Sequence, residues 1–374
     1  MSRQIFRILH VMRSPVGGLF RHVLDLAREQ TSRGHPVGII ADSTTGGEQA
    51  SRALAEIEPN LPLGLSRVPM SRQAGLLDRS ALRHVAKRAA AANANVLHGH
   101  GAKGGAYVRL TKTTAIRVYT PHGGSLNFSP YSPVGFVYLT IERWLRRRTD
   151  LLLFESEFAE RKFRRSVGEP PFHRVVHNGI GAADLVPVQP DEDAADFIYM
   201  GEMLRRKGVD LAIDALSHLA TGGWNGRAVL YGSGPDRASF EQRATALGLM
   251  HQVHFAGTAK AREAFRSGRV LLMPSRTESL PYMALEAIAA KVPLITTNVG
   301  GIPEIFGPDA CVLLPPGDVN ALAAEMRRMR SDGDPELNDR LRIRVAKFFT
   351  VEAMTEAILA AYGEALARKV VAST

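Results

Sequence analysis

The sequence is poor in cysteine and in long apolar runs. Its 374 residues include one cysteine, Cys311, so no disulfide can form within the chain, and a reducing compartment is compatible with this. The setting of Cys311, between Ala310 and a run of apolar residues, predicts a small buried residue in a strand at 311–314. No apolar run approaches the roughly 20 residues of a membrane-spanning helix. We therefore expect a cytoplasmic protein.

Acidic residues are also scarce relative to basic ones. Lys and Arg number 47 and Asp and Glu 37, which leaves 47 − 37 = +10. Such a balance favours anionic partners: nucleic acid, anionic lipid or phosphate ligands. The sequence has no zinc-finger spacing, no RNP-type aromatic strand and no arginine-rich tail, so we expect no nucleic-acid partner.

A basic and aromatic helix is predicted at 133–148. Its pattern suits a membrane surface, but it also suits a packed helix whose cations lie at the favourable C-terminus. The packed helix is the favoured interpretation. Peripheral membrane contact through the basic surface stays open as a functional alternative.

The length and the order of the elements indicate two domains. A chain of 374 residues is too long for one ordinary core. Apolar strands alternate with glycine-containing turns and helices, which is typical of α/β domains with doubly wound parallel sheets. The acidic, proline-containing stretch 185–196 predicts a linker. We predict an N-terminal domain over 1–184 and a C-terminal domain over 197–348.

One strand–helix–strand unit carries unusual polar groups. Strands are predicted at 270–273 and 294–297, with a helix at 282–290 between them. Polar residues follow the first of these strands, and ligands bind at that end of strands in open α/β sheets. The sequence therefore predicts a binding site there.

Two carboxylates in this unit, Glu278 and Glu286, stand eight positions apart, close to two helical turns. The N–H groups of Ser279 and Leu280, expected at the helix start, would be available to an anion such as a phosphate. One carboxylate could then bind sugar hydroxyls and the other a ribose. The alternative is an N-terminal Glu stabilised by the helix dipole and a second Glu on the surface.

The segment SRTESLPYMALEA, followed by PLITTNVGGIPEI, resembles the donor-site signature of retaining nucleotide-sugar glycosyltransferases of family four, the "group 1" type. The resemblance covers nearly the whole chain. It implies the GT-B fold, in which two doubly wound Rossmann-like domains face each other across a cleft, with the closing helix at 349–370 crossing back to the first domain. It also implies that Glu278 contacts the transferred sugar and Glu286 the ribose.

Other segments match the family in the same order. The resemblance implies that the Gly17-Gly18 turn lies near the donor phosphates and that His122 lies near the transferred sugar. It implies that Lys207 grips the diphosphate. The family usually has Arg where this chain has Glu202, so that Arg205 or Arg206 would replace that cation. The implied donor-binding residues are Gly17, Gly18, Arg205, Arg206, Gly234, Thr258, Ser279, Leu280 and Glu286, and the implied catalytic residues are Glu278, His122 and Lys207.

Two motif matches point elsewhere and are rejected. The hexapeptide at 99–104 fits G-x-G-x-x-G after a strand, but no Asp or Glu stands about 20 residues further on to hold a ribose. The acidic run 191–193 resembles an Asp-x-Asp metal site but lacks a flanking apolar strand. We therefore expect no cofactor and no metal.

The resemblance implies a retaining, metal-independent enzyme that moves a sugar from a nucleoside diphosphate-sugar to a glycan or lipid-linked acceptor. Cell-surface polysaccharide or glycolipid synthesis, at the inner face of the membrane, is the expected setting. Two rivals stay open: a sugar-nucleotide epimerase of the same fold, and a non-catalytic glycan- or lipid-binding protein, which the Glu202 departure favours.

Overall fold

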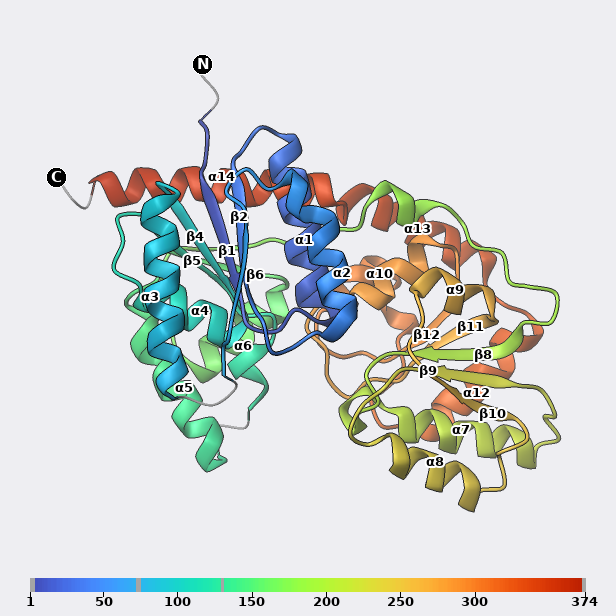
Figure 1. The fold of residues 1–374 in the computed structure, drawn as a ribbon. Helices are drawn as coiled ribbons and strands as arrows, with labels where there is room; N and C mark the ends of the chain where they lie inside the picture. Colours follow the sequence, from blue (N-terminus) through green and yellow to red (C-terminus); the bar gives the residue numbers. More distant parts are fainter. Residues whose placement is uncertain (1–3, 72–74, 129–130, 372–374) are drawn as a thin grey trace. The chain divides into compact units, whose positions relative to one another are not determined.

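The computed structural model describes residues 4–71, 75–128 and 131–371 and divides the chain into two compact units (Figure 1). The first unit comprises Met1–Gly179 with Val351–Thr374, and the second comprises Ile180–Thr350. The first unit thus ends a few residues before position 184. The stretch 185–196 lies in the second unit, where its last two residues already belong to a strand.

The first unit is built on a seven-stranded sheet in which all pairings are parallel. Neighbouring parallel strands are connected by crossovers, most of which contain a helix, and the first and fourth strands of the chain lie side by side at the centre of the sheet. From one edge to the other, the strands are β3 (Leu65–Val68), β2 (Val37–Asp42), β1 (Ile8–Met12), β4 (Val96–His100), β5 (Ile116–Thr120), β6 (Leu151–Phe154) and β7 (His173–Val175).

Helices cover both faces of this sheet. Along β1, Ile8 and Met12 pack with α1, α2 and α14, whereas Leu9 and Val11 pack with α3 and α4. This alternation is the two-residue period of a strand buried on both sides. The helices of the first unit are α1 (Gly17–Ser32), α2 (Gly47–Ile57), α3 (Leu76–Ala91), α4 (Gly101–Leu110), α5 (Pro133–Arg146), α6 (Glu157–Ser166) and α14 (Val351–Val371).

The rejected glycine motif has a packing role. The strand before the hexapeptide is β4, which extends to His100, and α4 begins at Gly101, within the hexapeptide. A Cβ at Gly104 would lie 2.3 Å from the carbonyl oxygen of Val11, and one at Gly105 would lie 2.2 Å from the ring of Tyr119. These glycines therefore let α4 approach β1 and β5 closely.

The second unit has a five-stranded, fully parallel sheet. Its strands, in spatial order, are β10 (Val253–Ala256), β9 (Ala228–Tyr231), β8 (Ala195–Met200), β11 (Gly268–Met273) and β12 (Leu294–Thr296). Apolar side chains on both faces pack against helices. The helices of the second unit are α7 (Val209–Thr221), α8 (Arg237–Ala246), α9 (Ala261–Arg266), α10 (Tyr282–Ala289), α11 (Ile302–Phe306), α12 (Val319–Ser331) and α13 (Pro335–Phe348).

Side-chain caps begin several helices. Ser132 and Ser156 accept hydrogen bonds from the backbone N–H of the residue three positions on, at 3.0 and 3.1 Å. Asp318 and Asp334 do the same for α12 and α13, at 2.9 and 3.0 Å. Each cap satisfies an N–H that has no partner within the helix.

The prediction for Cys311 is wrong. Residues Gly307–Val312 form a 3₁₀ helix, and Cys311 is exposed. Only Leu314 makes a strand-like bridge, to Thr297. A short apolar run does not distinguish a strand from a tight helical turn, and here Gly307 and the proline after it start the turn. No helix in the described part of the chain has the length and apolar character needed to cross a membrane.

Candidate functional site

Loops at the carboxyl ends of β8, β9, β11 and β12 meet backbone to backbone in the second unit. Gly208 has φ +74°, and a Cβ there would lie 1.9 Å from the carbonyl oxygen of Pro274. A Cβ at Gly300 would lie 2.2 Å from the carbonyl oxygen of Glu278. Only glycine permits approaches this close. The glycines therefore bring the loop after β8 and the loop after β12 against the loop that carries Glu278.

Lys207 and Glu278 form the centre of this cluster. The Lys207 Nζ lies 2.7 Å from Oε1 and 2.8 Å from Oε2 of Glu278, and Ser275 Oγ donates to Oε1 at 2.7 Å. The Glu278 side chain is 6% exposed and that of Lys207 is 21% exposed. Burial, and secondarily the charge of Glu278, raises the pKa of the nearby Tyr199 hydroxyl. The carboxylate is thus fixed by two donors from different loops.

The arginines around this pair are engaged to different degrees. Arg206 pairs with Glu202 at 2.8 Å. Arg276 holds both oxygens of Asp210, at 2.6 and 2.8 Å, and donates to the carbonyl oxygen of Arg205 at 2.7 Å. The Arg205 side chain is 82% exposed, and its Nε is 4.0 Å from Asp210. Of these three arginines, Arg205 is therefore the most available to a ligand.

The remaining predicted donor residues lie around these loops. Helix α10 begins at Tyr282, as predicted. Ser279 and Leu280 precede it, and Pro281 is extended, so their N–H groups are not the first N–H groups of the helix, and that part of the prediction is wrong. Glu286 is half-buried on α10, Gly234 lies in the turn after β9, and Thr258 is exposed after β10.

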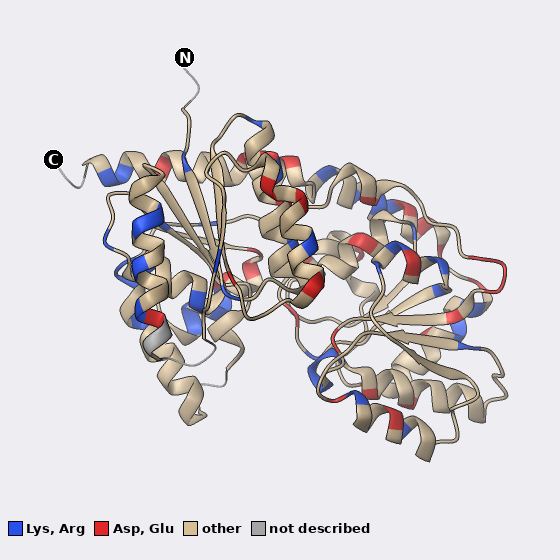
Figure 2. Cartoon of the chain, viewed as in Figure 1, with Lys and Arg blue, Asp and Glu red and all other residues tan. Residues whose placement is uncertain are grey.

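Charge does not concentrate at one place in either unit. Lys and Arg are interspersed with Asp and Glu over the ribbon (Figure 2), although the chain carries a net charge of +10. Within the loop cluster, Glu202, Asp210 and Glu278 offset three of the cations. Attraction of an anionic ligand would therefore depend on local donors more than on a broad positive surface.

In the first unit, Gly17 and Gly18 are exposed at the start of α1, and His122 follows the carboxyl end of β5. His122 has φ +50°, which is unusual for a residue with a side chain. Its Nε2 lies 3.1 Å from His100 Nδ1. His100 in turn contacts His10, and His22 and His98 lie beside them.

These five histidines are neutral at pH 7. Burial lowers the pKa of His10 to about 4. Burial, with the charge of His10 as a smaller cause, lowers the pKa of His22 to about 4. The pKa values of His98, His100 and His122 are held well below the ordinary value, first by burial and then by neighbouring histidines. Of these five, only His122 was predicted as a site residue from the sequence; the H-x-H pattern of β4 was a signal for two of the others, His98 and His100.

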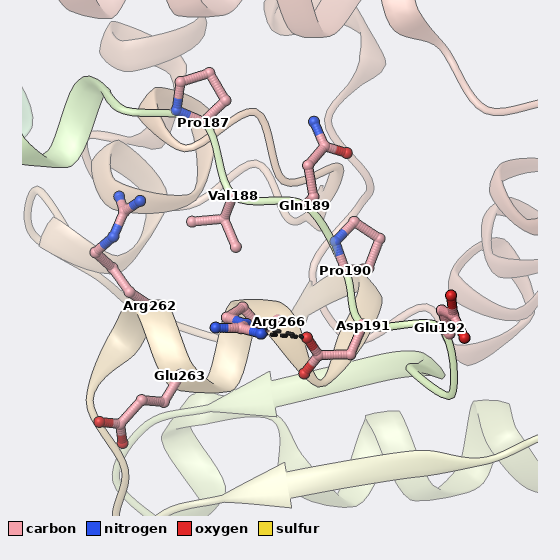
Figure 3. Close-up of a pocket in the computed structure, with 9 residues that line it drawn as sticks. All are labelled: Pro187, Val188, Gln189, Pro190, Asp191, Glu192, Arg262, Glu263 and Arg266. Atoms are coloured by element: carbon pink, nitrogen blue, oxygen red, sulfur yellow. Dashed lines mark hydrogen bonds and ion pairs between the residues drawn. The ribbon is translucent and has the colours of Figure 1, made fainter.

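A surface groove of about 640 Å³ lies elsewhere in the second unit (Figure 3). It is lined by residues 187–192 and by Arg262, Glu263 and Arg266 of α9. Arg266 pairs with Asp191 at 2.8 Å, and Arg262 donates to the carbonyl oxygen of Val186 at 2.9 Å. The groove precedes the starts of β8 and β11, at the edge of the sheet opposite the loop cluster. Its arginines hold the segment that leads into β8, so we do not assign a ligand to it.

Comparison with known proteins covers both units. Residues 16–183 match the model "Glycosyltransferase Family 4", and residues 184–348 match "Glycosyl transferases group 1". A 2-deoxystreptamine glucosyltransferase of Streptomyces kanamyceticus is 32% identical over 152 residues, 40% of this chain and 39% of that protein. A glycogen synthase of Mycobacterium tuberculosis is 29% identical over 199 residues, 51% of this chain and 48% of that protein. The matched part is less than half of the length of these curated relatives.

Solved structures resemble the whole chain. Sucrose-phosphate synthase from Thermosynechococcus elongatus has a TM-score of 0.79 at 20% identity, over 98% of this chain and 100% of that one. Anabaena HepE in complex with UDP-glucose has a TM-score of 0.79 at 17% identity, over 96% and 100%. At this identity the likeness concerns the fold. With the two family models spanning residues 16–348, the chain belongs to the group 1 glycosyltransferases of family four, which have the GT-B fold.

Proposed function

We propose that this protein is a retaining, metal-independent glycosyltransferase. The second unit binds a nucleoside diphosphate-sugar, and the first unit binds a glycan or lipid-linked acceptor. The complex of Anabaena HepE with UDP-glucose supports a donor of this class. The observation that carries the proposal is the Lys207–Glu278 pair at the carboxyl ends of β8 and β11, inside a loop cluster built by close glycine contacts.

The Lys207 ammonium is suited to bridge a carboxylate and a phosphate. Of its three N–H groups, two serve the oxygens of Glu278, and the third is available to a phosphate oxygen. As the diphosphate departs, a fixed cation at that position stabilises the developing charge. This is the role that a divalent metal would otherwise fill, and it supports a metal-independent reaction.

Retention is supported by the state of Glu278. Both of its oxygens are held by Lys207, and one is also held by Ser275, so the carboxylate is a poor nucleophile. It is better placed to accept hydrogen bonds from sugar hydroxyls. The departing phosphate would then take the proton of the acceptor hydroxyl on the same face of the sugar.

Arg205 is our choice for the cation that replaces the family's usual arginine. Arg206 already neutralises Glu202, whereas Arg205 is largely exposed and only loosely associated with Asp210. Arg205→Ala should weaken nucleoside diphosphate binding more than Arg206→Ala does. Equal losses in the two variants would contradict this assignment.

The other predicted roles stay proposals. Glu286 would bind the ribose, and Gly234 and Thr258 would lie along the nucleotide. The loop at 279–280 would border the donor. In the first unit, His122 and the Gly17-Gly18 turn would serve the reaction.

The acceptor is proposed by chemical class. The names of matched relatives include a teichuronic acid biosynthesis glycosyltransferase of Bacillus subtilis and a phosphatidylinositol N-acetylglucosaminyltransferase subunit of Arabidopsis thaliana. We propose a glycan or lipid-linked acceptor in cell-surface polysaccharide or glycolipid synthesis.

Helix α5 supports a membrane-surface location. Among the described residues, one face of α5 is buried in the unit, through Gly135, Leu139, Glu142 and Leu145. A second stripe, spaced as neighbours on one helix face, is between 45% and 54% exposed: Val134, Val137, Ile141 and Trp144. Arg148 lies 4.6 Å from the Trp144 ring centroid. An exposed apolar stripe beside cations is typical of helices that lie in a bilayer interface, and a packed helix alone does not account for it.

Thermal unfolding with UDP, GDP, ADP, dTDP and NAD, each with magnesium or with chelator, tests the donor site. A ligand at about 100 times its Kd stabilises by about 2.7 kcal/mol. We expect a shift with one nucleoside diphosphate, kept in chelator, lost in Lys207→Met and kept in Lys291→Met, which removes an exposed lysine of the same unit. The anomeric configuration of the transferred sugar, read by NMR, then tests retention.

Three results would redirect the proposal. A shift that needs magnesium would contradict metal independence. Turnover of the nucleotide sugar with no acceptor would favour an epimerase. No shift with any nucleotide would favour a non-catalytic binding protein and would give weight to Glu202.

Sedimentation with lipid vesicles tests the membrane proposal. We expect binding to phosphatidylglycerol vesicles, reduced in Ile141→Ser/Trp144→Ser and unchanged in Ile343→Ser, a control that removes a 67% exposed apolar residue of the second unit. Equal binding by all three chains would refute the role of α5.

A further inference from the structure

We infer that the first unit contains a transition-metal site formed by His22, His100 and His122. One ring nitrogen of each lies within 4.8 Å of the others. His22 comes from α1, His100 ends β4, and His122 follows β5. Three neutral imidazoles are a ligand set that suits Zn²⁺, with a fourth position left for water or another ligand.

The surrounding hydrogen bonds fix which nitrogen of His22 can bind a metal. His22 Nδ1 lies 3.1 Å from Asn178 Oδ1. An amide oxygen only accepts, so Nδ1 carries the proton and donates it. The lone pair of the neutral ring is therefore on Nε2. A ligand histidine whose other N–H donates to a protein oxygen is the usual arrangement at metal sites.

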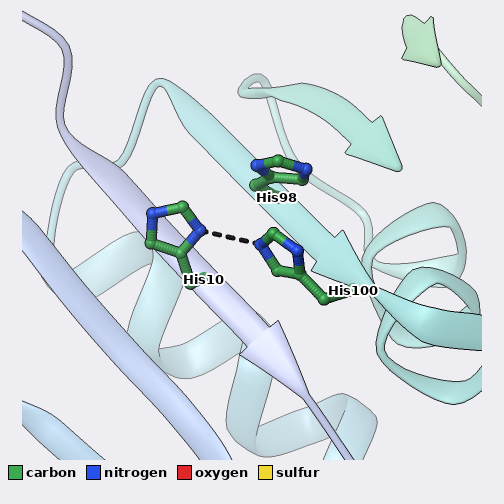
Figure 4. Close-up of side chains that lie close together, drawn as sticks. All are labelled: His10, His98 and His100. Atoms are coloured by element: carbon green, nitrogen blue, oxygen red, sulfur yellow. Dashed lines mark hydrogen bonds between the residues drawn. The ribbon is translucent and has the colours of Figure 1, made fainter. Parts of the chain in front are cut away.

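A longer chain fixes His100 in the same way. Gln30 Oε1 accepts from His10 Nε2 at 2.8 Å, which leaves the lone pair of His10 on Nδ1. His10 Nδ1 then accepts from His100 Nε2 at 3.0 Å (Figure 4). The lone pair of His100 is consequently on Nδ1, the atom that lies 3.1 Å from His122 Nε2. Gln30 and His10 thus orient His100 for a metal without binding it.

The spacing of the two atoms fits shared ligation. Two nitrogens at 2.0–2.1 Å from a tetrahedral Zn²⁺ lie about 3.3 Å apart, and His100 Nδ1 and His122 Nε2 lie 3.1 Å apart. When the ion binds, the proton of His122 leaves Nε2 and is taken up at Nδ1 of the same ring, so the ring stays neutral. His122 is only half-buried, which gives the ion a route in.

A second histidine group, His10, His98 and His100, fits a metal less well. His98 Nδ1 lies 2.7 Å from the Tyr362 hydroxyl, and His98 Nε2 lies 2.8 Å from Thr120 Oγ1, so both nitrogens have partners. Its ring lies over that of His100, with centroids 3.9 Å apart (Figure 4). His98 therefore serves as a matched control: a buried histidine beside the site that is not a ligand.

Calorimetric titration with ZnCl₂ of chelator-treated protein tests the site. The background chain carries His218→Gln, His251→Gln and His254→Gln, which removes exposed histidines that bind zinc weakly. We expect one Zn²⁺ per chain, and loss of this binding in His22→Gln, His100→Gln and His122→Gln. His10→Gln, which removes only the orienting hydrogen bond, should weaken binding about 10- to 100-fold, and His98→Gln should retain it.

Absence of stoichiometric binding, or its persistence in His122→Gln, would overturn the inference. Loss of zinc binding in His98→Gln, together with zinc binding retained in His22→Gln, would assign the ion to His10, His98 and His100 and would also overturn the inference. If His100→Gln does not fold, zinc binding by the His122→Gln variant, whose substituted residue is only half-buried, decides the question. Co²⁺ absorption gives a second measurement, because a tetrahedral ion has intense visible bands that His122→Gln should abolish. The site shares His122 with the proposed function, but neither readout depends on glycosyl transfer, so failure of this inference and failure of the proposed function are distinguishable.

Discussion

Removing Lys207 should separate its contribution to stability from its contribution to catalysis. In Lys207→Met, the Glu278 carboxylate loses both ammonium hydrogen bonds and keeps only the Ser275 hydroxyl. Breaking a fully buried ion pair from one side costs about 3–5 kcal/mol. Because Lys207 is 21% exposed, water can enter in its place. We therefore expect a loss of about 2 kcal/mol in the free energy of unfolding.

The double variant Lys207→Met/Glu278→Gln removes the charge that the single variant leaves buried. Its stability should recover most of the loss, because a neutral amide is much less costly to bury than a carboxylate. For a unit of the size of residues 180–350, a loss of about 2 kcal/mol lowers Tm by about 4–8 °C. Thermal unfolding followed by circular dichroism at pH 7 resolves such a difference. Lys291→Met, which breaks an exposed pair with Asp339, should change the unfolding free energy by about 1 kcal/mol or less.

Turnover should not follow stability. Loss of a fixed cation at the departing charge lowers turnover by about 10²–10³ in the single variant, and the double variant has no cation to restore it. A double variant no more stable than the single one would refute the claim that Lys207 offsets a buried carboxylate. Near-normal turnover in Lys207→Met would refute its catalytic role.

Three further predictions concern packing and charge. Gly208→Ala should lower the free energy of unfolding by more than about 1–2 kcal/mol and abolish nucleotide binding, because its Cβ would clash with the backbone. Gly223→Ala, at φ +88° but in open space, should lower it by only about 1–2 kcal/mol. Equal unfolding midpoints of the two variants in urea would contradict this. Arg109→Met should lower the free energy of unfolding by about 3–5 kcal/mol, because it leaves the Glu142 carboxylate buried without its ion-pair partner. Adding Glu142→Gln should restore part of this free energy, measured by urea unfolding. No recovery would argue against an electrostatic cause. Burial raises the pKa of Asp42, but hydrogen bonds to its carboxylate outweigh this and lower the pKa below 3.8. Its stabilisation is therefore present above about pH 4 and lost as the pH falls through the folded pKa, so Asp42→Asn should cost about 1–3 kcal/mol at pH 7 and little in strong acid; a cost independent of pH would contradict the sign.

The sequence predicted elements well where turn residues flank an apolar run. The helix predicted at 282–290 is α10, Tyr282–Ala289, and the strand predicted at 294–297 is β12, Leu294–Thr296. Pro281 and Pro293 precede these two segments and leave few alternative starts. The family and the GT-B fold were also predicted correctly, because the donor-site motif is local in sequence.

Other elements were missed because their signals are weak. Strand β3 lies in the stretch 43–76, which is rich in glycine, proline, serine and arginine and has no continuous apolar run at β3 to indicate a strand; residues 72–74 of it lie outside the described part. Helix α4 begins in a glycine-rich segment that looked like a nucleotide-binding turn. Helix α13 is rich in charge and has few apolar positions. In each case the burial that stabilises the element comes from packing against distant segments.

Contacts between site residues that are distant in sequence were also not predicted. Lys207 and Glu278 are 71 positions apart, and their contact follows from the parallel register of β8 and β11 rather than from either segment alone. Sequence motifs identified both residues but not their ion pair. Ser275 and Arg276 were overlooked because each resembles an ordinary loop residue. The contact between His100 and His122 likewise requires β4 and β5 to end side by side.

The clustered side chains at the carboxyl ends of the strands are charged and ion-paired in the second unit, whereas in the first unit they are mainly neutral histidines. In the second unit, charged groups are packed together, and they are stable there because nearly every cation has a carboxylate. In the first unit, ring nitrogens of neighbouring histidines lie about 3 Å apart, and burial favours the neutral form of these imidazoles. A neutral ring offers one donor and one lone pair, which suits sugar hydroxyls or a metal ion and does not attract a diphosphate. An ammonium with one unused N–H suits the diphosphate. This difference in side-chain charge supports the proposal that the second unit binds the anionic part of the substrate.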